Sequence, residues 1–139
     1  MSDAGSFLSL AQRAVDGGLD YARERDLRMT LVVMDATGTV CAAARMDGSR
    51  PITYAIAVAK ANTARLFLTS TAVLAGRVKP ENKIAIGQLG DDIAFLGGGL
   101  PIERDGVVIG AIGASGATEE QDVECADAAL AATGLAPTS

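Results

Sequence analysis

The chain has 139 residues, 12 basic against 17 acidic side chains, a formal net charge of −5, and neither histidine nor tryptophan. Because 49% of the residues are hydrophobic, a chain of this length predicts one globular domain over residues 1–139. The absence of histidine excludes Ser-His-Asp and Cys-His catalysis and histidine-ligated zinc. No apolar run approaches the ~18 residues of a membrane span, and an acidic balance with few aromatic residues argues against nucleic-acid binding.

The two cysteines predict neither a disulfide nor a metal site. Cys41 and Cys125 are far apart and match no Cys-x-x-Cys spacing, so we expect both to behave as small buried apolar side chains. The sequence starts without the basic and then apolar segments that are typical of secretion signals. We therefore expect a cytoplasmic protein without a bound metal ion.

The first third of the chain predicts a helix followed by a β-hairpin. Apolar residues recur at three- and four-residue spacing over residues 6–25, and Ser6 can cap this helix. Two extended runs, 29–34 and 39–46, flank turn-forming residues at 35–38, which is the pattern of two antiparallel strands.

The middle of the chain predicts two helices and a long connection. Residues 53–68 are rich in alanine and free of glycine and proline, which favours a helix that can pack closely. A short helix is predicted over 71–75, capped by Thr69 or Ser70. Residues 77–92 show poor periodicity and contain a proline and two glycines, so they predict a long connection.

The last third predicts three strands and a helix. Asp105-Gly106 is a strong signal for a type I′ turn, and Thr118 with Gln121 matches the capping box at a helix start. The predicted strands are residues 93–96, 100–104 and 107–114. The element order α-ββ-αα-βββ-α predicts an α+β fold in which helices flank a five-stranded antiparallel sheet.

The charges are concentrated in two segments. Residues 119–127 contain five acidic and no basic side chains, so the rest of the chain sums to zero. Residues 45–83 carry seven basic against two acidic side chains, a local charge of +5. The acidic segment fits the start of a helix, where carboxylates favour the macrodipole, and the basic segment is where we expect a site for an anion.

Two glycine-containing segments are candidates for ligand binding. Gly97, Gly98 and Gly99 leave backbone N–H groups accessible to an anion or a carbonyl oxygen, and Pro101 fixes the chain after them. The alternative for these glycines is a bulge or a close helix contact. Ser115 precedes a helix N-terminus that could bind a carboxylate or phosphate, although a simple helix cap explains it as well.

Arg45 and Lys60 are the strongest candidates for functional side chains. Arg45 ends a strand beside a loop and has the fork geometry that binds a carboxylate. Lys60 lies in an alanine-rich helix, where partial burial would let it act as a base or Schiff-base amine. The alternatives for Lys60 are an exposed helix face or an ion pair with Asp47 or Glu81. Tyr54 and Asp47 could complete a catalytic site around Lys60.

Five motifs in one order resemble the GlcG/HbpS family, and the resemblance covers residues 8–133. They are Arg45-Met46-Asp47-Gly48, Lys60-Ala61-Asn62-Thr63-Ala64, the segment 97–102, the segment 105–116, and Gln121-Asp122. The resemblance implies a profilin-like α+β domain that assembles into dimers, tetramers or octamers. Members of this family include haem-binding proteins, domains fused to cobalamin adenosyltransferases, proteins encoded with catabolic pathways, and a few enzymes that act on small unsaturated acids.

Haem is the cofactor that this resemblance implies. Histidine is the iron ligand in at least some haem-binding members, and this chain has none. Another side chain would therefore have to hold the iron, and the sequence offers Tyr21, Tyr54, Met46, Cys41 and Lys60 for that role.

The leading interpretation is a small-molecule-binding homo-oligomer whose pocket favours an anionic ligand, either haem or a small organic acid. This pocket would combine residues 45–50, the helix from Tyr54 to Lys60 and the turn from Gly97 to Pro101. The main alternative is a cofactor-independent isomerase, hydrolase or lyase that acts on an activated unsaturated or keto acid, with the glycine turn stabilising an enolate-like oxygen. A third interpretation is an accessory protein whose acidic helix docks on a basic partner.

Overall fold

The computed structural model describes residues 5–90 and 92–137, which form five helices and four strands. In chain order these are α1 (Phe7–Glu24), β1 (Thr30–Asp35), β2 (Val40–Arg45), α2 (Ile52–Phe67), α3 (Thr71–Arg77), α4 (Pro80–Gly87), β3 (Gly99–Arg104), β4 (Val107–Ser115) and α5 (Glu119–Ala132). None of the helices within these described ranges is long and apolar enough to cross a membrane.

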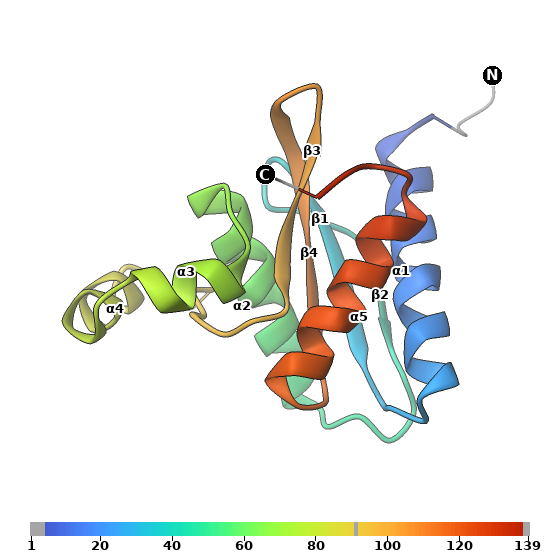
Figure 1. Cartoon of the computed structure of the whole chain (residues 1–139), viewed down its shortest axis with the longest axis horizontal. Helices are drawn as coiled ribbons and strands as arrows, with labels where there is room; N and C mark the ends of the chain where they lie inside the picture. Colours follow the sequence, from blue (N-terminus) through green and yellow to red (C-terminus); the bar gives the residue numbers. More distant parts are fainter. Residues whose placement is uncertain (1–4, 91, 138–139) are drawn as a thin grey trace.

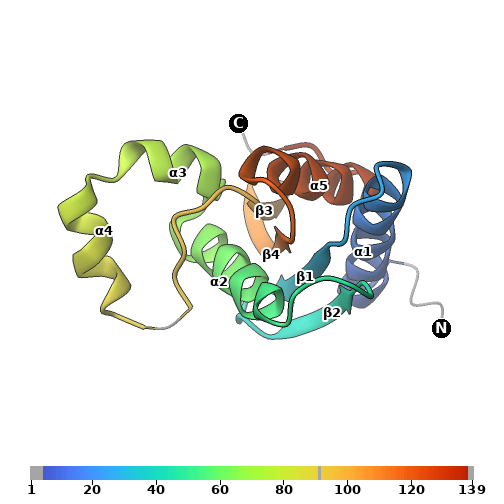
Figure 2. The same cartoon turned by 90° about the horizontal axis from the view of Figure 1, so that it is seen from below.

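The strands form one antiparallel sheet in the order β2-β1-β4-β3. Helices α1 and α5 cover one face of this sheet and α2 covers the other, while α3 and α4 extend sideways from the body (Figures 1 and 2). The α+β class and the antiparallel pairing are confirmed, but the prediction of five strands is wrong because the sheet has four.

The missing strand is the predicted segment 93–96, which has no strand structure. Its backbone is held by α2 instead, because the Ala94 N–H donates to Thr63 Oγ1 at 2.9 Å. Just before it, Asn62 Nδ2 donates to the Asp92 carbonyl at 3.0 Å. Side chains of α2 thus form the hydrogen bonds with this backbone that a neighbouring strand would otherwise form.

The predicted connection 77–92 contains helix α4, so this prediction is also corrected. Pro80 lies in the first turn together with Glu81, both of which favour a helix start. Helix α4 buries none of its residues. A helix without a buried face has no apolar periodicity, which is the signal on which the prediction depended.

Local capping and turn signals gave correct helix starts and a correct β3–β4 turn, although α3 ends at Arg77 and not at residue 75. The Ser6 and Ser70 side chains accept hydrogen bonds from first-turn N–H groups of α1 and α3. Thr118 and Gln121 form both halves of the capping box at the start of α5. The β3–β4 turn has positive φ at Asp105 (53°) and Gly106 (80°), as a type I′ turn requires.

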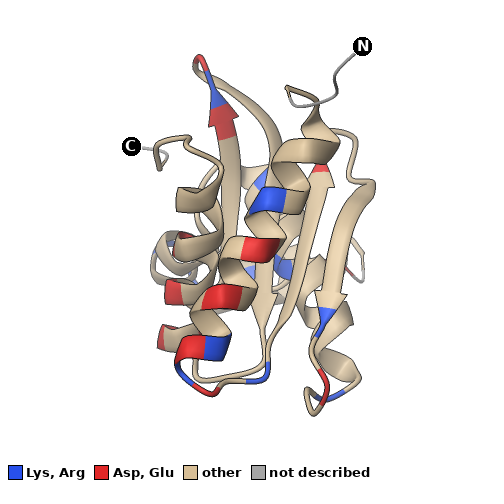
Figure 3. Cartoon of the chain, turned by 90° about the vertical axis from the view of Figure 1, so that its right-hand side faces the viewer, with Lys and Arg blue, Asp and Glu red and all other residues tan. Residues whose placement is uncertain are grey.

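The core has two parts, one on each face of the sheet. The larger part lies between the sheet and helices α1 and α5, and the smaller part packs alanines of α2 against Met34 and Ala111. The strands carry charged residues only at their ends, as the colouring in Figure 3 shows. Apolar burial on both faces therefore holds the sheet between its helices.

Helix α2 approaches β4 so closely that no side chain fits between them at Gly113. A Cβ atom on Gly113 would lie 1.9 Å from the backbone oxygen of Ala57. Backbone cannot move aside as a flexible side chain can, so a glycine at this position is a packing requirement.

Gly113→Ala should therefore lower the free energy of unfolding by about 3 kcal/mol or more, because α2 must shift away from the sheet. Denaturant unfolding measures this loss. The matched control is Gly76→Ala in α3, where a Cβ meets nothing within 4 Å and the change should stabilise by about 0.5–1 kcal/mol. Equal stabilities of the two variants would contradict the packing argument.

Candidate functional site

A polar cavity of about 330 Å³ lies where the loop after β2, the first turn of α2 and the end of β4 meet. We call it the Arg50 pocket. Its lining residues are Arg28, Gly48, Ser49, Arg50, Ile52, Thr53, Ile56, Ser115, Gly116 and Ala117. Of the predicted pocket, only residues 48–50 of the loop and Ile56 of the helix line this cavity, and the turn from Gly97 to Pro101 does not. Ser115, predicted separately as a ligand-binding residue, also lines it.

Strand pairing directs Ser115 toward α2. Thr30 of β1 lies directly opposite Ser115 in the sheet, and the Thr30 hydroxyl is 2.7 Å from the Thr53 hydroxyl of α2. Residues paired in this way share a face of the sheet. Ser115 is only 4% exposed, and its hydroxyl has no hydrogen-bond partner among the residues that the structure describes. A buried hydroxyl without a partner is costly unless water or a ligand binds it.

Two arginines give this pocket a positive charge. Arg50 is exposed at the pocket rim, and within residues 5–90 and 92–137 its guanidinium has no ion-pair or hydrogen-bond partner. Arg28 reaches the pocket from the segment before β1 and contacts the Asp26 carboxylate at 3.2 Å. No side chain caps the N-terminus of α2, where Pro51 holds the N-cap position. The pocket therefore combines guanidinium groups with the positive end of a helix dipole.

Arg45, the predicted carboxylate ligand, does not line the Arg50 pocket but binds the backbone of its loop. Its Nη1 donates to the Ser49 carbonyl at 2.8 Å. Arg45 and Asp47 line a separate shallow cavity next to α1. Tyr54 is 44% exposed and lines neither cavity. The structure therefore does not bring Arg45, Asp47 and Tyr54 into the Arg50 pocket.

Lys60 lies in a buried ion pair with Asp122 of α5. Its Nζ is 2.8 Å from Asp122 Oδ2 and donates to the Ala114 carbonyl at 3.0 Å. The two side chains are 3% and 6% exposed. Burial raises the pKa of Asp122, and the hydrogen bond and charge of Lys60 oppose that shift. The predicted ion-pair partners, Asp47 and Glu81, are wrong, and Lys60 does not line the Arg50 pocket.

The glycine turn is packed tightly and lies away from the Arg50 pocket. The Gly97 N–H donates to the Glu119 carboxylate and the Gly99 N–H to the Thr71 hydroxyl, each at 2.8 Å. Gly98 has φ +123°, and a Cβ on Gly99 would lie 2.3 Å from the Lys60 carbonyl oxygen. Close packing, the alternative weighed for these glycines, accounts for this geometry.

Pro101 follows the glycine turn in β3 and is also buried. It lines a cavity of about 300 Å³ on the α5 side of the molecule, together with Arg77 and Asp127. Pro101 therefore does not share a cavity with Ser115 or with the 48–50 loop.

Within residues 5–90 and 92–137, four of the five side chains considered as iron ligands are already engaged in hydrogen bonds. Tyr21, Met46, Cys41 and Lys60 all make internal hydrogen bonds. Tyr54 is the one remaining candidate, and it stands on the exposed face of α2. As a separate matter from haem, the described ranges contain no group of three or more Cys, Asp or Glu residues arranged to hold a free metal ion.

The cysteines are both free. Cys125 is buried and Cys41 is half-buried, so burial is confirmed in full for the first and in part for the second. Burial raises the pKa of the Cys125 thiol to about 12 and also raises the pKa of Cys41. Both thiols are therefore protonated and poorly nucleophilic at neutral pH.

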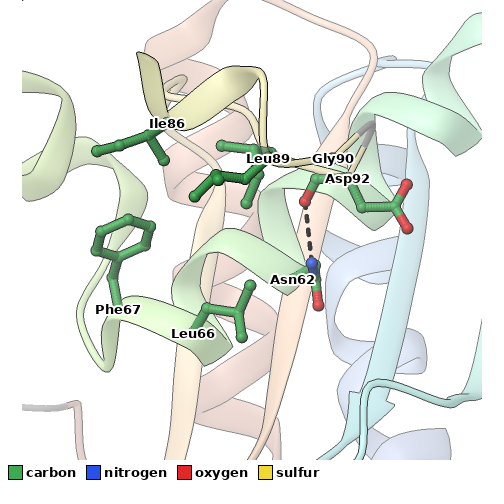
Figure 4. Close-up of a pocket in the computed structure, with 8 residues that line it drawn as sticks. Asn62, Leu66, Phe67, Ile86, Leu89, Gly90 and Asp92 are labelled. Atoms are coloured by element: carbon green, nitrogen blue, oxygen red, sulfur yellow. Dashed lines mark hydrogen bonds between the residues drawn. The ribbon is translucent and has the colours of Figure 1, made fainter. Parts of the chain in front are cut away.

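A further, more apolar cavity of about 450 Å³ lies between α2 and the end of α4 with the segment that follows it (Figure 4). Leu66, Phe67, Ile86 and Leu89 point toward it, and Asn62 binds the backbone at its edge. Its only charged lining residue among those described is acidic, so this cavity does not favour an anion.

Several residues of the Arg50 pocket were not predicted from the sequence. Arg50 belongs to the basic segment but had no predicted role, although an arginine before Pro51 at an uncapped helix start is a local signal. Arg28, Ser49 and Thr53 were not singled out. Arg28 belongs to a different part of the chain, and only the packing of β1 beside β4 brings it to the pocket.

The described fold and pocket define a small α+β domain with a cationic cavity at one end of its sheet. A family model described as haem degrading protein HbpS-like matches residues 8–131. The chain belongs to this HbpS-like family, which confirms the resemblance found in the sequence.

Relatives of known name or structure agree with this assignment. The chain is 35% identical over 125 residues to an uncharacterized 15.0 kDa protein in the dhaT-dhaS intergenic region of Citrobacter freundii, and the match covers 88% of each. It is 31% identical over 119 residues to the corrinoid adenosyltransferase PduO of Salmonella typhimurium, covering 84% of this chain but only 35% of that enzyme. A crystal structure of a PduOC:heme complex superposes with a TM-score of 0.88 at 27% identity, covering 94% of this chain and 96% of the other.

Tyr21, one of the residues considered for iron, lies instead in a cluster between α1 and α5. Its hydroxyl donates to Glu124 Oε2 at 2.5 Å, and the Arg25 guanidinium lies 3.9 Å from the centre of its ring. Burial, followed by the hydrogen bond to Glu124, raises the pKa of Tyr21 to about 12.

Tyr54→Phe leaves Tyr21 as the only tyrosine, so near-ultraviolet absorbance of the phenolate can follow it alone. We expect a midpoint near pH 12 rather than the ordinary tyrosine pKa of 10.0. Because the folded pKa is the higher one, this contribution to stability is complete below pH 10 and is lost as the pH rises through about 12. A midpoint near 10 in a chain that circular dichroism shows to be folded would contradict this environment.

Proposed function

We propose that the chain binds a small organic acid in the Arg50 pocket. The observation that carries the proposal is the unpartnered, buried Ser115 hydroxyl at the uncapped start of α2, beside the unpaired Arg50. A carboxylate satisfies all three groups, since it accepts hydrogen bonds from a hydroxyl, from helix N–H groups and from a guanidinium.

Haem is the second anionic ligand to consider, because one similar structure is a PduOC:heme complex. The propionates of haem could bind the arginines, but the iron would find no histidine and few free donor side chains. We therefore favour a small carboxylic acid over haem.

The enzymatic alternative receives less support from the geometry. Lys60, Tyr54 and Asp47 do not line the cavity that contains Ser115. Catalysis by these three residues therefore stays a prediction without support from this pocket. Lys60 in particular is bound on both sides, by Asp122 and by the Ala114 carbonyl. A base or Schiff-base amine needs access to its substrate, which this arrangement does not offer.

We also propose that the chain forms a homo-oligomer. Several large apolar side chains are more than 40% exposed on and around α3 and α4, namely Leu66, Leu68, Val73, Ile84 and Leu89. Exposed apolar groups gathered on one part of a surface are typical of contacts between subunits.

Titration with acetate, succinate and pyruvate should give saturable binding by isothermal calorimetry or NMR, whereas neutral acetamide should not bind. Arg50→Ala should weaken the binding about tenfold or more, because it removes a charge-assisted hydrogen bond. Arg104→Ala, at the exposed end of β3, is the matched control and should leave the affinity unchanged.

Hemin serves as the competing probe in the same experiment. A saturable Soret shift with hemin, together with no response to any of the carboxylates, would show that the ligand is a tetrapyrrole and not a small organic acid. If neither class of ligand binds saturably, or if Arg50→Ala binds as tightly as the original chain, the proposed function is wrong.

A further inference from the structure

The buried Lys60–Asp122 pair contacts the wall of the Arg50 pocket through the backbone. Lys60 Nζ donates to the Ala114 carbonyl at 3.0 Å, and Asp122 Oδ1 accepts from the Ala117 N–H at 3.0 Å. The pair thus binds the chain on both sides of Ser115 and Gly116, the two residues between these anchor points that line the pocket.

The backbone of Ser115 and Gly116, between the two anchor points, has little room to change its conformation. Gly116 has φ +147°, and a Cβ there would lie 2.4 Å from the Arg28 carbonyl oxygen. The same short segment therefore sets the place of the Ser115 hydroxyl and contacts the backbone of Arg28, one of the two pocket arginines.

Stability alone is a weak reason for such a pair. The cost of removing both charges from water offsets most of their attraction, and apolar residues of similar volume often replace buried ion pairs without loss. A pair whose remaining hydrogen bonds all go to one functional segment is better explained by the conformation it imposes.

We propose that Lys60 and Asp122 are positioning residues for the ligand of the Arg50 pocket. They hold residues 114–117 in the one backbone conformation that presents the Ser115 hydroxyl to an anion. Neither side chain touches the ligand, because neither lines the pocket. The inference rests on the proposed function for the identity of the ligand, but the fixed conformation of 114–117 is a property of the unliganded chain as well.

The test replaces both charges at once with the double variant Lys60→Met/Asp122→Leu. Its melting temperature should stay close to that of the original chain, because the pair is exchanged for apolar contacts. Its affinity for succinate should fall about tenfold, the size of effect that supporting residues have on ligand-binding groups. Amide hydrogen exchange at Ser115, Gly116 and Ala117 should become at least about tenfold faster without ligand.

Two further variants complete the experiment. Glu120→Leu removes an exposed acid from the same helix turn and should change neither affinity nor exchange at 115–117. Asp122→Asn replaces one carboxylate oxygen with an NH2 group, so its single acceptor oxygen cannot bind both Lys60 Nζ and the Ala117 N–H. This variant provides the test if the double variant does not fold. In Asp122→Asn we expect weaker succinate binding and faster exchange at Gly116 and Ala117.

The results separate the two proposals. If a folded Lys60→Met/Asp122→Leu or Asp122→Asn chain keeps both the original affinity and the original exchange at 115–117, the positioning role is wrong while the proposed function stands. If the original chain binds no carboxylate, the proposed function is wrong, and the exchange rates alone decide whether the pair fixes the segment.

Discussion

The close approach of α2 to the sheet is the constraint on which the rest of the structure depends. The helix can lie where it does only because Gly113 and Gly99 offer no side chains to the carbonyl oxygens of Ala57 and Lys60. The same approach brings the first turn of α2 beside Ser115 and places the Lys60 ammonium under the end of β4. The Arg50 pocket and the buried Lys60–Asp122 pair therefore both depend on the distance between α2 and the sheet. Close packing sets this distance.

Those parts of the fold that depend on local chemistry could be predicted from the sequence. The Thr118 capping box and the Asp105-Gly106 turn work through neighbouring residues, so no tertiary information is needed. The segment 93–96 failed because its extended pattern is that of a strand, while hydrogen bonds from α2 decide its actual path. Helix α4 was missed because it has no buried face and therefore no periodic pattern.

The candidate site was predicted only in part, because its residues are far apart in the chain. The predicted basic segment contains Arg50 and the loop before α2, which line the candidate pocket. Arg45, in contrast, forms a hydrogen bond with the Ser49 carbonyl of that loop. Asp122 belongs to one of the five family motifs, but its sequence neighbours indicate only the first turn of a helix and not a partner 62 positions away. With histidine absent and Lys60 paired internally, charge recognition by arginine and hydroxyl groups is the chemistry that the described surface best supports.

The lack of buried residues in α4 has a consequence for local stability. An isolated helix shorter than about 12 residues is marginal in water, and α4 has eight residues with no face packed into the core. The free energy that keeps α4 helical must therefore be much smaller than the free energy of global unfolding. In a single chain whose α4 is not covered by another subunit, the segment can open and close while the sheet and its three covering helices stay folded. Proteases will then cut first in this segment rather than in the body of the domain.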